Sequence, residues 1–192
     1  SWASLLFDMN NDGLNDIFVA NGIYKDLLDR DYLAYMANET QVKMLLENKE
    51  NAIEKLIDIM PSEAVPNSAF KNLGVFKFED KTGEWGLDVT SFSNGSAYGD
   101  LDNDGDLEIV TAMKSGTIYI FHHDGSIYNN FPYTVAGNIE TTPAIGNLDS
   151  DDDLEIVFGT TSGLEVIDIK SESGERDSWK LHRGNMMRTG LY

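Results

Sequence analysis

Three short acidic segments carry the residue types and the spacing that bind a hard metal ion. They cover residues 8–16, 100–108 and 147–155, and they read DMNNDGLND, DLDNDGDLE and NLDSDDDLE. Together they hold 13 of the chain's 33 acidic residues and no basic residue. So many carboxylates within nine residues repel one another unless a cation lies among them. The pattern therefore predicts a divalent-cation site in each segment.

Aligning the three segments gives an oxygen ligand at positions 1, 3, 5, 7 and 9. Position 7 is expected to offer its backbone carbonyl, and position 6 is expected to be a turn. An all-oxygen, flexible site suits Ca²⁺ better than Mg²⁺, whereas zinc prefers His or Cys. We expect two to three Ca²⁺ ions. The predicted ligands are Asp8, Asn10, Asp12, Leu14 and Asp16 in the first loop, Asp100, Asp102, Asp104, Asp106 and Glu108 in the second, and Asn147, Asp149, Asp151, Asp153 and Glu155 in the third.

The loops also have two other interpretations. An EF-hand begins in the same way, but it needs a Glu at position 12 and a helix after the loop. Here position 12 is Val19, Thr111 or Phe158, and the residues around it are apolar and largely β-branched, as in a strand. Simple Asp- and Asn-rich turns are the other alternative, which three aligned copies make less favoured. Loop 100–108 is expected to bind best and loop 147–155 worst, because Asn147 replaces a carboxylate there.

The segments around the loops predict short antiparallel strands. The first residues of the loops are separated by 92 and then 47 positions, and repeats of the shorter period are typical of propellers or arrays. Residues 116–121 alternate like a strand, 122–126 read as a hairpin turn, and 127–135 and 142–146 read as further strands. About four antiparallel strands with one acidic loop have the size of a propeller blade.

A helical insertion is expected at residues 24–66. Apolar residues between Leu27 and Met60 recur at helical spacing, and Pro61 should end the last helix. Two or three short helices are predicted. Such an insertion could serve as a partner-binding lid, and a helical cap with a solvated face is the favoured alternative.

Two longer stretches resemble the FG-GAP/VCBS repeats of integrin-α-like β-propellers, in their bacterial form. They are SAYGDLDNDGDLEIV at 96–110 and TPAIGNLDSDDDLEIVFGT at 142–160, and residues 70–74 with 78–80 and 85–87 are similar to the strand pair before such a loop. The resemblance implies a mainly β fold of antiparallel propeller-type blades, a partial propeller, with 1–192 as one repeat domain. It also implies structural Ca²⁺ in the acidic loops, an extracellular or cell-surface location in a bacterium, and an adhesive function toward a protein or glycan.

Composition narrows the possible functions further. A net charge of −19 disfavours nucleic acid as a partner, and no apolar run is long enough to span a membrane. No nucleophile or general base stands out, and the neighbouring His122 and His123 are best interpreted as turn residues.

A fragment of a Ca²⁺-dependent polysaccharide-degrading enzyme and a structural spacer remain the alternatives to a binding module. The tail at 178–192 is expected to pack on the last blade, and the open sheet edges predict further blades or self-association.

Overall fold

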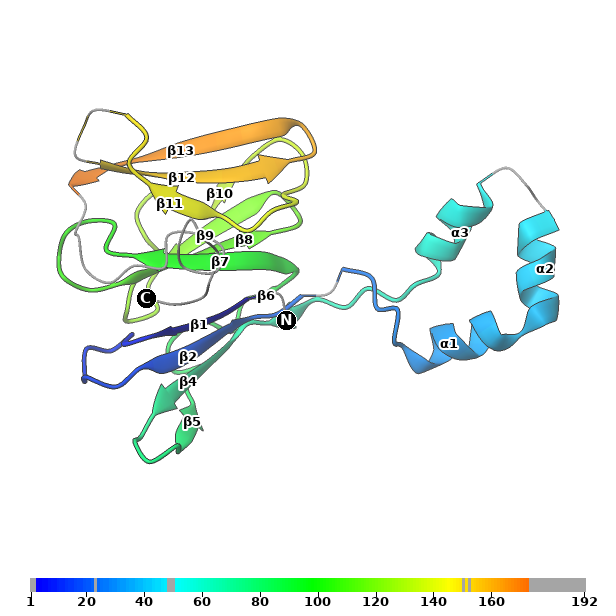
Figure 1. Cartoon of the computed structure of the whole chain (residues 1–192), viewed down its shortest axis with the longest axis horizontal. Helices are drawn as coiled ribbons and strands as arrows, with labels where there is room; N and C mark the ends of the chain where they lie inside the picture. The colour runs from blue at the N-terminus through cyan, green and yellow to red at the C-terminus, as the bar shows by residue number, and fades with distance from the viewer. Residues whose placement is uncertain (1–2, 23, 48–50, 150, 152, 173–192) are drawn as a thin grey trace. The chain divides into compact units, whose positions relative to one another are not determined.

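The computed structural model describes residues 3–22, 24–47, 51–149, 151 and 153–172 (Figure 1). This part of the chain is mainly antiparallel β-structure arranged in several sheets. It divides into two compact units. We call Ser1–Gly22 with Val65–Tyr192 the β unit, and Ile23–Ala64 the helical unit. The expected tail at 178–192 lies outside the described residues.

The helical unit contains three short helices, as the apolar spacing predicts. They are α1 (Arg30–Ala37), α2 (Glu39–Glu47) and α3 (Ala52–Asp58). The Asp29 carboxylate caps α1 by accepting the Tyr32 N–H at 2.9 Å. Tyr32 is the one buried residue among the helical side chains that the structure describes, whereas Leu33 of α1 and Ile53 of α3 are 48% and 73% exposed. Apart from Tyr32, the described apolar side chains of these helices are therefore partly or largely exposed.

The first sheet of the β unit has the strand order β1-β2-β4-β5. Its strands are β1 (Ala3–Phe7), β2 (Asp16–Ala20), β4 (Ser68–Asn72) and β5 (Phe78–Asp80). Alternate residues of β2 are buried, because one face of the sheet packs on the core. The helical unit lies in the chain between β2 and β4. A separate pair of two-residue strands, β3 (Val65–Pro66) and β6 (Thr90–Ser91), connects the segment before β4 to the segment before β7.

The second and third sheets repeat the same antiparallel meander. The second has the order β10-β9-β8-β7 and the third has the order β11-β12-β13. Their strands are β7 (Ser93–Gly99), β8 (Glu108–Met113), β9 (Thr117–Phe121), β10 (Tyr133–Thr134), β11 (Ala144–Gly146), β12 (Asp153–Thr160) and β13 (Gly163–Glu172). The returning strand expected at 127–135 is reduced to β10. Asn130 interrupts it with a left-handed φ of 65°, and Pro132 has no N–H to donate.

Apolar side chains fill the spaces between the three sheets. Every residue of β8 is buried, because successive side chains alternate between two cores. Ile109 packs with Leu5 and Phe18 of the first sheet, whereas Val110 packs with Ile156 of the third. The second sheet is thus covered on both faces by its neighbours (Figure 1). Among the described residues, the sheets do not close into a barrel or a propeller.

Candidate metal centre

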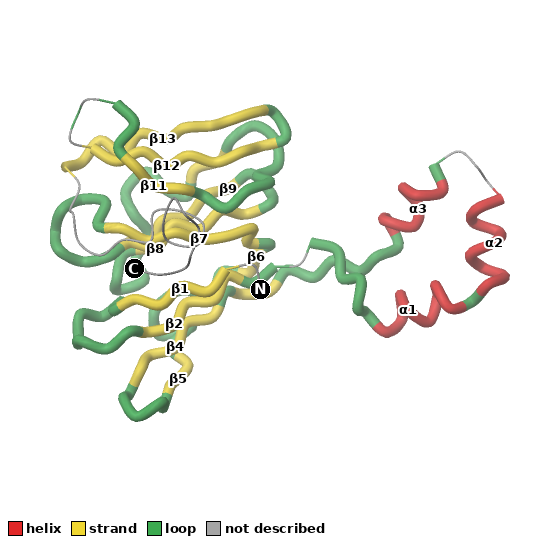
Figure 2. The backbone as a smooth tube through the Cα atoms, in the orientation of Figure 1, coloured by secondary structure: helices red, strands yellow, loops and turns green. Residues whose placement is uncertain are grey.

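The three acidic loops occupy equivalent positions in the three sheets. Loop 8–16 connects β1 to β2, loop 100–108 connects β7 to β8, and loop 147–155 connects β11 to β12. Each loop therefore joins the first strand of its sheet to the second. Figure 2 shows the first two loops at the same end of the stacked sheets, and the Asn11 side-chain amide donates a hydrogen bond to Asp106 Oδ1 between them.

The closing carboxylate at position 9 is buried in every loop. Asp16, Glu108 and Glu155 are 1%, 0% and 3% exposed. Each accepts a hydrogen bond from the backbone N–H of position 2 of its own loop, which fastens the two ends of the loop together. The bonds are Met9 N–H to Asp16 Oδ2 at 3.2 Å, Leu101 N–H to Glu108 Oε2 at 2.8 Å and Leu148 N–H to Glu155 Oε2 at 2.5 Å.

Hydrogen bonds from backbone to side chain fold the loops into successive turns. In all three loops, the position-5 carboxylate accepts the N–H of position 7, at 3.0, 2.8 and 3.2 Å. In the first two loops, the position-1 carboxylate accepts the N–H of the glycine at position 6, at 2.8 and 3.3 Å. Gly13 and Gly105 have φ of 86° and 91°, a left-handed conformation that suits glycine. Asp152, at position 6 of the third loop, lies outside the described residues.

Loop 100–108 gathers three carboxylates at one point. One oxygen each of Asp100, Asp102 and Asp104 lie within 4.8 Å of one another. Asp100 is only 3% exposed, yet its Oδ1 has no hydrogen-bond partner among the described residues, and neither has the buried Oδ1 of Asp102. Burial, together with the nearby Asp104 carboxylate, raises the pKa of Asp102. Buried carboxylate oxygens without partners are costly, and a cation between them would remove that cost.

Glu108 adds a fourth carboxylate to this group. Burial, reinforced by the charges of Asp102, Asp104 and Asp100, raises the pKa of Glu108 to about 8, although the Leu101 N–H opposes the shift. Without a cation, Glu108 is therefore mostly protonated at neutral pH. A divalent ion would reverse the local balance and favour the carboxylate.

Two histidines that the sequence suggested as turn residues lie against this loop. His122 Nδ1 is 3.3 Å from Glu108 Oε1, and His123 Nδ1 is 2.9 Å from Asp106 Oδ2. His122 also belongs to a group with Asp102 and Glu108 whose ligand atoms lie within 4.8 Å of one another. A signal for this was available, because a β8–β9 hairpin turning at Ser115-Gly116 places residue 122 opposite residue 108.

Loop 147–155 forms a second cluster. Oxygens of Asp149, Asp151 and Glu155 lie within 4.8 Å of one another, and the buried Oε1 of Glu155 has no hydrogen-bond partner among the described residues. The Asn147 side-chain amide donates to the backbone carbonyl of Asp151 at 2.5 Å. In this structure Asn147 therefore acts as a donor that braces the loop. Asp153, the remaining ligand predicted here, begins β12.

Loop 8–16 differs because a lysine neutralises part of its charge. The Lys71 ammonium of β4 lies 3.1 Å from Asp12 Oδ2, and this contact lowers the pKa of Asp12. Asp16 accepts a further hydrogen bond from the Asn72 N–H at 2.8 Å. In the described chain, this loop brings no three carboxylate or imidazole groups within 4.8 Å of one another. Nothing in the loop itself revealed Lys71, which lies 59 positions after Asp12.

The donor sets of the second and third loops fit a divalent cation. Both present clustered carboxylates, and each contains an almost completely buried residue with one oxygen that has no hydrogen-bond partner in the described part of the chain. Acidic clusters in these loops can therefore hold a metal ion. Among the described residues, no helix is long and apolar enough to cross a membrane.

Comparison with known proteins leaves the family open. No protein-family model matches the chain, and no curated protein matches it either. The resemblance to FG-GAP/VCBS repeats therefore stays a prediction based on the loops and their flanking strands.

Proposed function

We propose that this chain is a Ca²⁺-stabilised β-repeat module of the FG-GAP/VCBS type, which serves binding or adhesion outside the cell or at its surface. The observation that carries the proposal is Asp100: its buried carboxylate keeps one oxygen without a hydrogen-bond partner among the described residues, beside the carboxylates of Asp102 and Asp104. Calcium is the favoured ion because the donors are all oxygens on a loop of successive turns, whereas Mg²⁺ demands stricter octahedral geometry.

The role of the ion is structural in this proposal. A bound cation would cancel repulsion within the loop and join β7 to β8 at the point where β8 enters the core. Modest affinity is sufficient outside cells, where Ca²⁺ is plentiful. Three consecutive sheets, each with its acidic loop between the first and second strands, support the propeller-type repeat. Closed propellers have about four to eight blades, so further sheets, a second copy or another partner would cover the outer sheets.

The proposal is tested by the effect of Ca²⁺ on thermal unfolding. At a Ca²⁺ concentration about 100 times the dissociation constant, each occupied site stabilises the folded state by about 2.7 kcal/mol. For a chain of this size, that raises the melting temperature by about 5–10 °C. We expect this rise for Ca²⁺ and a smaller one for Mg²⁺. Asp104→Ala should reduce it, whereas Asp88→Asn, an exposed carboxylate outside the loops, should not. Equal melting temperatures with Ca²⁺ and with chelator would contradict the proposal.

A further inference from the structure

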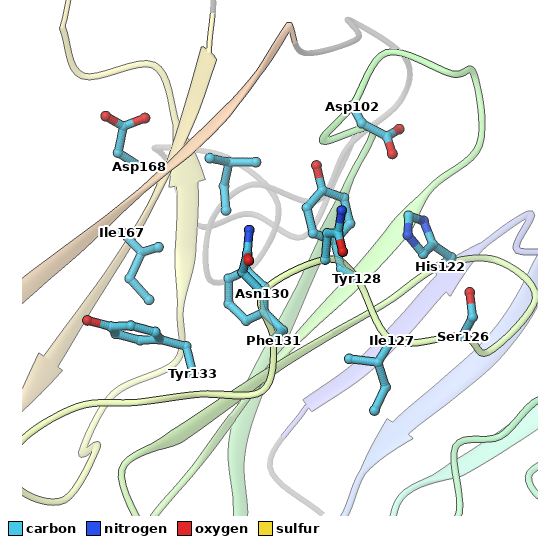
Figure 3. A pocket seen from close by; sticks show the side chains of 12 residues that line it. Asp102, His122, Ser126, Ile127, Tyr128, Asn130, Phe131, Tyr133, Ile167 and Asp168 are labelled. Carbon is cyan, nitrogen blue, oxygen red and sulfur yellow. The ribbon is translucent and has the colours of Figure 1, made fainter.

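A cavity of about 680 Å³ opens beside loop 100–108 (Figure 3). Its volume falls in the range of sites that bind small molecules. One wall is the segment 126–133, which follows β9, and another is the stretch 167–169 of β13. Asp102 and His122 line it as well, so the cavity and the candidate metal site share a boundary. The proposed structural role of the metal does not use this cavity.

Aromatic rings line part of the cavity. Tyr128 is held firmly, because it stacks on His122 with ring centroids 5.0 Å apart and meets Phe131 edge-on at 6.1 Å. Tyr133 lies further along the same segment and is 49% exposed. Figure 3 shows Tyr133 near Ile167 of β13, with Phe131 between Tyr133 and Tyr128. The arrangement leaves aromatic surface open to a ligand, on a wall that packing already holds in place.

Most polar groups of the cavity are neutral. Asn129 and Asn130 are exposed amides, and each can both donate and accept hydrogen bonds. Asp102 and Asp168 supply carboxylates, and among the residues that the structure describes neither Lys nor Arg lines the cavity. The missing cations disfavour phosphorylated or polyanionic ligands, which need Arg or Lys. Aromatic faces combined with amides and carboxylates suit a molecule that has apolar C–H faces and many hydroxyl groups.

We infer that this cavity binds a short neutral oligosaccharide. One sugar ring would lie on Tyr133, and its hydroxyls would hydrogen-bond to Asn129 and Asn130. This inference rests on the proposed binding function and gives it a ligand class. An organic cation would also meet aromatic rings and carboxylates here. The sugar is favoured because Asp102 already belongs to the metal cluster, and because Asp168 is the one carboxylate among the exposed lining residues that the structure describes, whereas the exposed Ser126, Asn129, Asn130 and Tyr133 are uncharged.

The test is calorimetric titration of the whole chain in millimolar Ca²⁺ with single probes. The neutral probes are maltotriose, cellotriose and laminaritriose, the anionic probe is trigalacturonic acid, and the cationic probe is tetramethylammonium. We expect saturable binding of at least one neutral trisaccharide. Tyr133→Ala should weaken it by about tenfold or more, as loss of an aromatic anchor does. Asn129→Ala should weaken it as well, and Phe76→Ala, which removes a 97% exposed ring that does not line the cavity, should not.

Each outcome decides the matter. Absence of binding by all three neutral trisaccharides overturns the inference, as does preferred binding of the cation or the anion, or equal affinity in the Tyr133 and Phe76 variants. Failure of the proposed function is separate, because it appears as the absence of any Ca²⁺ effect on melting. A protein that Ca²⁺ stabilises but that binds no neutral sugar keeps the proposed metal role and loses this ligand. Sugar binding by a protein that Ca²⁺ does not stabilise would support the sugar site and contradict the proposed role of the metal.

Discussion

Burial of Glu108 should make the metal-free protein less stable as the pH rises. Its side chain is fully buried beside Asp100, Asp102 and Asp104, with His122 as its imidazole neighbour, and its pKa is raised from the ordinary 4.5 to about 8. In chelator, the folded state therefore holds a proton that the unfolded chain has released. The stabilisation that this proton gives to the folded state is complete below pH 4.5 and is lost as the pH rises to about 8.

The size of the effect follows from the two pKa values. At about 1.4 kcal/mol per pKa unit, the interval from 4.5 to about 8 corresponds to up to about 5 kcal/mol of unfolding free energy. Glu108→Gln removes the titration and keeps an oxygen to accept the Leu101 N–H. In chelator, the variant should match the wild type near pH 4.5 and exceed it increasingly toward pH 8.

Urea unfolding in chelator at pH 4.5 to 8.5 measures this difference directly. The wild-type free energy minus that of Glu108→Gln isolates Glu108 from the other groups that titrate in this range. Glu63→Gln serves as the control, because Glu63 is exposed and should leave the pH dependence unchanged. A constant difference between wild type and Glu108→Gln across this range would refute the reasoning that burial perturbs this carboxyl.

Substitutions at three places test separate parts of the structure. Lys71→Ala removes the ammonium 3.1 Å from Asp12, so it should strengthen Ca²⁺ binding to loop 8–16, and a count of bound ions by equilibrium dialysis checks this. The side chains of Ile109 and Val110 lie in different cores, so Ile109→Ala and Val110→Ala should both lower the free energy of unfolding measured in urea, the first by about 2–5 kcal/mol. An unchanged free energy for either variant would contradict the burial of β8 on both faces. Replacing Val75-Phe76 by Asn-Gly should raise the unfolding free energy by about 1–2 kcal/mol, because both residues hold left-handed φ of 52° and 56°, and an unchanged urea midpoint would argue against strain at this hairpin tip.

Local sequence patterns predicted the loops and the strands that follow them. The spacing of carboxylates within nine residues and the β-branched residues after Glu108 are local signals, and both the turns and β8 follow from them. The three helices also follow from local periodicity. The apolar spacing that includes Leu28 nevertheless did not predict that Leu28 is exposed, because burial depends on packing partners that a local pattern does not contain.

The parts that sequence reasoning missed depend on contacts between distant positions. Lys71 reaches Asp12 only because β4 pairs with β2, and His122 reaches Glu108 only through the register of β8 and β9. The cavity beside loop 100–108 likewise needs β13 to lie near the segment that follows β9. Such contacts depend on the tertiary arrangement, whereas the conformation of each loop is determined by residues within the loop itself.

The central claim is that the acidic loops are metal sites, and counting bound ions tests it most directly. The measurement is a calorimetric Ca²⁺ titration of chelator-stripped protein, with Asp104→Ala compared in parallel. We predict saturable binding of two to three ions, with one fewer in the variant. No binding at millimolar Ca²⁺ would mean that the three loops are acidic turns alone, and the proposed function would be wrong.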